Sequence, residues 1–118
     1  MSIVAELSAK TGVVAAGEYA YRGDRFSYKG NLTENHARMA SIMCRATTMS
    51  ANMGAGMIAA FCPQFNIQPV RGWVVRGPEY TVCVMANVFC LIDNQKGSVN
   101  QILGFMRQAL DHETMDLI

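Results

Sequence analysis

Cysteine is the residue type in this chain with the most obvious chemical potential. The 118 residues include four of them: Cys44, Cys62, Cys83 and Cys90. No two form a Cys-x-x-Cys pair, so the sequence holds neither a zinc knuckle nor a thioredoxin-like redox motif. If Ala86-Asn87 is a two-residue hairpin loop, Cys83 and Cys90 lie opposite each other on one sheet face. Such a pair could bind a soft metal in part or approach disulfide distance, whereas two buried thiols packed as small hydrophobic side chains are the ordinary alternative.

Cys44 is the third candidate reactive thiol, beside Cys83 and Cys90, because the positive charge of the next residue, Arg45, favours a thiolate. We expect Cys44 and Cys62 to lie on one helix at similar angles but about five turns apart, so they cannot share a ligand within one chain. An antiparallel pair of helices could bring them together.

Other arrangements typical of catalysis or ligand binding are missing from the sequence. His36 and His112 are not at metal-ligand spacing with cysteines or carboxylates, and neither a G-x-G-x-x-G motif nor a P-loop occurs. Arg71 and Arg76 flank Trp73 as in a platform for single-stranded nucleic acid, but one tryptophan and a net charge of +1 argue against that partner. We therefore expect no catalytic residue, no cofactor, no metal and no nucleic acid.

Length and composition indicate one domain over residues 1–118 with a real core. The hydrophobic content of 51% excludes disorder. Only 16% of residues are charged, against roughly 25% in an average protein, so part of the surface is expected to meet a partner. The N-terminus has no basic region before an apolar run, and the uncharged stretch 46–70 is interrupted by Gly and Pro. We expect a cytoplasmic protein that does not enter a membrane.

The first half of the chain predicts a short helix, a hairpin and a long helix. Ser2 caps the short helix, and strands 13–21 and 25–29 are joined by the turn Arg22-Gly23-Asp24. Asn31 has capping-box spacing to Glu34, with Thr33 as the alternative cap. The long helix continues to about Cys62, where Pro63 stops it.

The second half of the chain predicts three antiparallel strands and a last helix. The pattern changes to a period of two over residues 70–76, 80–85 and 88–93. Ser98 then begins the last helix, with Gln101 at capping-box spacing. The order αββαβββα, with strands clustered between helices, is typical of an α+β single domain with one five-stranded sheet.

The long helix has more apolar surface than one sheet can cover. We expect its solvent face to be Glu34, Arg38, Ser41, Arg45, Thr48 and Asn52. The face toward the sheet is expected to be Ala40, Met43, Ala46, Ser50, Gly54, Met57 and Phe61. A further flank between these two is apolar and favours a partner: Ile42, Met49, Met53 and Ala60. The alternative is that loops or terminal segments of the same chain cover this flank.

Gly54 and Gly56 support close packing in the second half of this helix. Each costs a helix about 1 kcal/mol relative to Ala. Close approach of another backbone is the usual compensation, either from the sheet or from a second copy.

Several segments carry a resemblance to a known family: Gly12-Val13-Val14-Ala15-Ala16, the tight turn at Gly23, and the long Ala/Met helix. With the order αββαβββα, they resemble the roadblock / dynein light chain family over residues 2–111. The segments His36–Ala40 with Met43-Cys44, Gly72-Trp73 and Cys83–Asn87 look like a small prokaryotic group of that family of unassigned function.

The resemblance implies a five-stranded antiparallel sheet of order 2-1-5-4-3, with the long helix on one face and the terminal helices on the other. It also implies a non-catalytic homodimer joined through the third strand and the long helix. On this sequence the interface maps to Arg71, Trp73, Val75, Ile42, Met49 and Met53. This mapping agrees with the surplus apolar flank.

Two hypotheses for function follow. The first is a homodimeric interaction module, a scaffold or regulator in a cytoplasmic assembly, without chemistry of its own. The alternative is a thiol-based redox or sulfur-metabolism accessory protein, similar to those of heterodisulfide-reductase-like systems, that uses Cys44 or the pair Cys83 and Cys90.

Overall fold

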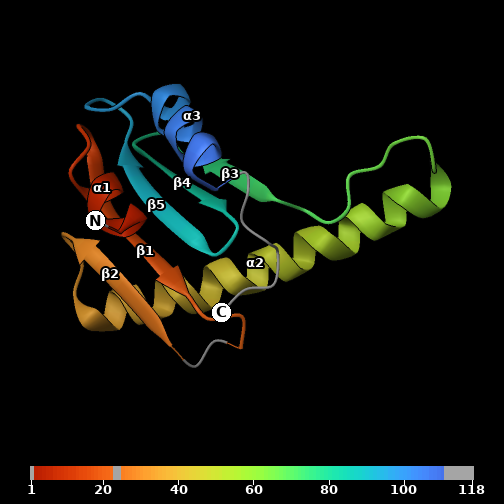
Figure 1. Cartoon of the computed structure of the whole chain (residues 1–118), viewed down its shortest axis with the longest axis horizontal. Coiled ribbons are helices and arrows are strands. Elements are labelled where there is room, and N and C mark those ends of the chain that lie inside the picture. The colour runs from red at the N-terminus through yellow and green to blue at the C-terminus, as the bar shows by residue number, and fades with distance from the viewer. Residues whose placement is uncertain (1, 23–24, 111–118) are drawn as a thin grey trace.

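The computed structural model describes residues 2–22 and 25–110, and one antiparallel sheet organises them. The elements are α1 (Ile3–Ser8), β1 (Val13–Tyr19), β2 (Phe26–Gly30), α2 (Glu34–Phe61), β3 (Gly72–Arg76), β4 (Tyr80–Met85), β5 (Val88–Asp93) and α3 (Val99–Leu110). The strand order is β2-β1-β5-β4-β3, as expected (Figure 1). The expected turn residues Gly23 and Asp24, and also His112, lie outside the described residues.

Side-chain caps decide where the helices begin. The Ser2 hydroxyl accepts the backbone N–H of Ala5, and the Ser98 hydroxyl accepts that of Gln101. For α2 the cap is Thr33, the alternative, whose hydroxyl accepts the N–H of His36 at 3.1 Å, so the prediction of Asn31 as the cap is wrong. The boundaries of β4 and β5 are the predicted ones.

Two hydrophobic clusters lie on opposite faces of the sheet. One packs α1 and α3 against the sheet and contains Leu7, Ile92 and Met106. The other lies between α2 and the sheet and contains Tyr19, Val84 and Phe89. The long helix therefore covers one face and the terminal helices cover the other, as the family resemblance implied (Figure 1).

The predicted orientation of α2 is wrong. Its buried residues include Ser41 and Thr48, which we had placed on the solvent face. Met43, Met57 and Phe61, which we had placed against the sheet, are exposed. From Ser41 onward the helix thus turns its polar stripe inward and its apolar side outward, whereas Glu34 and Arg38 at its start are exposed, as predicted.

Hydrogen bonds explain why the polar stripe can face the rest of the molecule. Thr48 Oγ1 accepts the indole N–H of Trp73 at 2.8 Å and donates to the Cys44 carbonyl oxygen at 3.0 Å. Asn52 Oδ1 accepts the backbone N–H of Val70 at 2.9 Å. Arg45 donates from Nε to the Tyr21 carbonyl oxygen.

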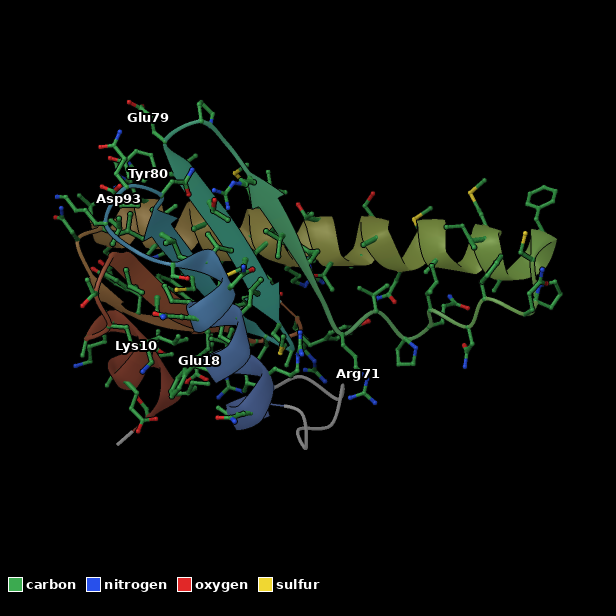
Figure 2. All side chains as sticks on the ribbon, turned by 90° about the horizontal axis from the view of Figure 1, so that it is seen from above. Lys10, Glu18, Arg71, Glu79, Tyr80 and Asp93 are labelled. Carbon is green, nitrogen blue, oxygen red and sulfur yellow. The ribbon has the colours of Figure 1, made fainter. Side chains whose placement is uncertain are left out.

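The second half of α2 projects beyond the sheet. Figure 1 shows the helix passing the β3 edge and the chain then returning to β3 along it. We call the segment Met53–Phe61, together with the return segment 62–71, the arm. No Lys, Arg, Asp or Glu occurs between Arg45 and Arg71, so the arm is uncharged up to its base (Figure 2).

Candidate interaction surface

The outer side of α2 is a continuous apolar surface. Its exposed large hydrophobic residues are Met39, Ile42, Met43, Met49, Met53, Met57, Ile58 and Phe61. Met53 keeps 74% of its surface accessible and Phe61 keeps 83%. Because large contiguous apolar areas on a protein surface are typical of contact sites, this surface is a candidate for one.

A groove lies beside α2 on the same face of the sheet. Its volume is about 310 Å³, and it is lined by Leu32, Ala40, Met43, Cys44, Thr47, Trp73, Val75, Val82, Phe89 and Leu91. It exists because α2 packs over β1, β2 and β3 at an angle and leaves part of β4 and β5 uncovered. The lining contains no charged residue, so the groove favours an apolar occupant.

β3 is an outer strand of the sheet and pairs on one side with β4. Its other edge presents backbone N–H and C=O groups that can pair with a further strand. Val75 on this strand is exposed and lines the groove, and Trp73 is half-buried beneath α2. The indole of Trp73 is held by Thr48, so it is not an open platform for nucleic-acid bases.

The six residues that we mapped to an interface divide between two sides of α2. Trp73 and Val75 lie at the groove, where the helix contributes Met43 and Thr47. Met49 lies on the other side of the helix, beside Tyr21 in a pocket with Tyr19. The remaining three are exposed: Ile42 and Met53 on α2, and Arg71 at the base of the arm (Figure 2). The sequence pattern did not predict Met43, Thr47 and Phe61 as surface residues, because the apolar side of the helix was expected to face the sheet.

The thiols do not form one site. Cys83 and Cys90 are directly opposite each other on β4 and β5, as predicted, but both are fully buried under α3. Cys83 Sγ lies 3.7 Å from Sδ of Met106. Cys44 belongs to the cluster on the other face of the sheet. All four cysteines are free.

Burial raises the pKa of Cys44 to about 12, with a smaller contribution from the charge of Cys83, so the expected lowering by Arg45 is wrong. A hydrogen bond from Cys90 lowers the pKa of Cys83, against the effect of its burial. The same hydrogen bond, together with burial, raises the pKa of Cys90. Burial of all three candidate thiols limits their access to reagents and partners.

Within residues 2–22 and 25–110, no group of three or more His, Cys, Asp or Glu side chains could hold a metal ion. Over the same residues, no helix combines the length and the apolar character needed to cross a membrane.

Comparison with solved structures identifies the fold. The structure is similar to the crystal structure of a Roadblock/LC7 domain from Streptomyces avermitilis, with a TM-score of 0.60 and 14% sequence identity over 92% of this chain and 94% of that chain. The expected roadblock-like fold is therefore confirmed. The chain itself belongs to the family described as "Uncharacterized conserved protein (DUF2173)", whose model matches residues 3–108. No curated protein matches it.

Proposed function

We propose that this protein is a non-catalytic interaction module that acts as a homodimer, joined through β3 and α2. The observation that carries the proposal is the outward apolar side of α2, on which Met53 and Phe61 are 74% and 83% exposed. Burying such side chains releases roughly 25 cal/mol for each Å² of apolar surface removed from water. A second copy of the chain offers the same surface.

The sheet supports the same partner. An outer strand such as β3 is prone to uncontrolled pairing unless another strand or element covers it. When β3 pairs antiparallel with β3 of a second copy, the backbone N–H and C=O groups at both strand edges form hydrogen bonds, and a twofold axis relates the two copies. Homodimers with this symmetry are the commonest soluble oligomers. The dimer then presents two equal faces to a further protein of a larger assembly, as a scaffold or regulator.

The thiol-based alternative has weaker support. Three of the four cysteines are buried, and the pKa of Cys44 is raised to about 12, so a thiolate at that position is rare near neutral pH. Timed alkylation of the native protein separates the two functions. Fast modification of Cys44, Cys83 or Cys90 at pH 7 would favour the redox function, whereas protection of all three favours the interaction module.

Met53→Glu tests the dimer. The substitution places a charge on the outward face of α2, so a dimer that buries Met53 dissociates or aggregates. Light scattering coupled to gel filtration should give twice the mass of the chain for the unsubstituted protein and a monomer or aggregate for Met53→Glu.

Lys29→Glu is the matched control, because Lys29 is also exposed but lies on β2, the outer strand at the opposite edge of the sheet from β3 (Figure 1). It should leave the mass unchanged. If Met53→Glu remains a dimer, α2 is not part of the interface. If the unsubstituted protein is a monomer at all concentrations, the proposal is overturned.

A further inference from the structure

Two hydrogen bonds fix α2 over β3 and over Val70, which lies two residues before the strand. The indole N–H of Trp73 donates to Thr48, and the backbone N–H of Val70 donates to Asn52. The helix therefore passes over the edge between Thr48 and Asn52. Everything beyond this point, which is the arm, extends past the sheet of its own copy (Figures 1 and 2).

Strand spacing then places the arm on a second copy. Paired strands lie about 4.8 Å apart, so the twofold axis of the proposed β3 pair runs about 2.4 Å beyond β3. With a rise of about 1.5 Å per residue, this is one to two residues beyond Asn52, near Met53. If two antiparallel copies of α2 meet at this axis, a residue a given number of positions after Met53 in one helix lies beside the residue the same number of positions before Met53 in the other. The two residue numbers then add up to about 106, which is twice 53. The far end of each arm consequently reaches the part of the other helix that forms the groove wall.

The chemistry of the two surfaces matches. The groove has no charged lining residue and the arm carries no charge between Arg45 and Arg71. Phe61, near the far end of the arm, is exposed over 83% of its surface. A volume of about 310 Å³ is at the small end of the range for binding pockets, which suits a few side chains better than a large cofactor.

We infer that the groove of each copy receives the arm of the other copy, with Phe61 of one chain against the wall formed by Met43, Cys44 and Thr47 of its neighbour. This inference rests on the proposed homodimer and specifies its contact. It brings Cys62 of one copy close to Cys44 of the other, although the two lie far apart within one chain. The groove is then an interface pocket rather than a site for a small apolar ligand or an unrelated protein.

Cross-linking tests the register directly. In a Cys44→Ala background, Met43→Cys places an exposed thiol at the groove wall, where Cys62 of the second copy is expected. Mild oxidation should join most chains into covalent dimers, and Cys62→Ser should abolish them. Met39→Cys is the matched control, because it is also an exposed methionine on α2 but lies outside the groove lining. Equal cross-linking from residues 39 and 43 would overturn the inference.

A charge exchange tests the contact in solution. Phe61→Lys or Thr47→Glu alone should weaken homodimerisation at least tenfold, because each places an unpaired charge at an apolar contact. Mixing the two variants should restore a heterodimer, since the lysine of one chain meets the glutamate of the other while the second contact remains native. Ser27→Lys, at an exposed position on β2 at the opposite edge of the sheet from β3, should change nothing.

The outcomes separate the inference from the function on which it rests. If the unsubstituted chain is a dimer that neither Phe61→Lys nor Thr47→Glu weakens, the arm contact is wrong and the dimer stands. If the chain is a monomer throughout, both fail. If Thr47→Glu releases a copurified apolar molecule, seen by mass spectrometry, and the dimer persists, the groove is a ligand site and the inference is overturned.

Discussion

Thr48 is the residue that turns the polar stripe of α2 toward the sheet. Its hydroxyl accepts from Trp73 at 2.8 Å, donates to the carbonyl oxygen of Cys44 at 3.0 Å and lies 3.4 Å from the hydroxyl of Tyr19. A buried polar side chain with such partners costs little, whereas the same side chain without them is expensive. Polarity alone therefore does not identify the exposed face of a helix.

Thr48→Val should destabilise the protein by about 1–3 kcal/mol, because it keeps the shape of the side chain but leaves the Trp73 indole N–H without its acceptor. Urea denaturation at a fixed protein concentration measures the change. In a double-mutant cycle, Trp73→Phe removes the donor as well, so Thr48→Val should cost less in that background. Equal costs in both backgrounds would show that the hydrogen bond contributes nothing.

Cys44 should make the free energy of unfolding fall with pH above about 9. Its pKa is raised to about 12 by burial, while an unfolded thiol has a pKa of 9.0. Between these values only the unfolded chain releases the proton, so stability decreases by at most about 1.4 kcal/mol per pH unit from this group, and below pH 9 the group has no effect. Urea denaturation in reductant from pH 8 to 11 should show a shallower fall for Cys44→Ala. Parallel curves for the two proteins would contradict the raised pKa.

At the scale of elements, the sequence predicts where helices and strands begin and end better than it predicts which side of a helix is buried. Capping residues and the change of hydrophobic period are local, and they placed β4, β5 and both ends of α2 within a residue or two. The orientation of α2 is not local. The apolar side of α2 was expected to face the sheet because burial of apolar side chains is favourable. A helix whose apolar side packs against a second chain has the same sequence pattern. One sequence does not distinguish a core face from an interface face.

Gly54→Ala provides a test at this scale, because the isolated protomer and the dimer predict opposite results. A Cβ at Gly54 or at Gly104 in α3 meets nothing within 4 Å in the protomer, so each substitution should stabilise its helix by about 1 kcal/mol. If α2 packs closely on a second copy, Gly54→Ala weakens dimerisation and Gly104→Ala does not. Thermal unfolding and sedimentation equilibrium of both variants decide between these cases. If both substitutions stabilise the protein and dimerisation is unchanged, Gly54 is not part of the contact between copies.

At the scale of the whole molecule, the candidate site was predicted in part. The surplus of apolar residues and the scarcity of charge indicated a partner, and Met53 and Val75 are exposed as an interface requires. The groove was not predictable, because it depends on the angle at which α2 crosses the sheet and on which strands the helix leaves uncovered. The arm was also missed, since the periodicity of α2 continues unchanged where the sheet beneath it ends.

Dimerisation should make thermal stability depend on protein concentration. If the folded chain exists as a dimer and the unfolded chain as a monomer, each tenfold increase in concentration adds about 1.4 kcal/mol to the free energy of unfolding per dimer. For a dimer of this size the Tm rises by roughly 3–5 °C. Calorimetry over a hundredfold range of concentration should show this rise for the unsubstituted chain. Phe61→Lys should flatten it while Ser27→Lys on β2 preserves it, because only the first alters the apolar arm. A Tm that is independent of concentration in all three proteins would mean that the outward side of α2 is stable in water without a second copy.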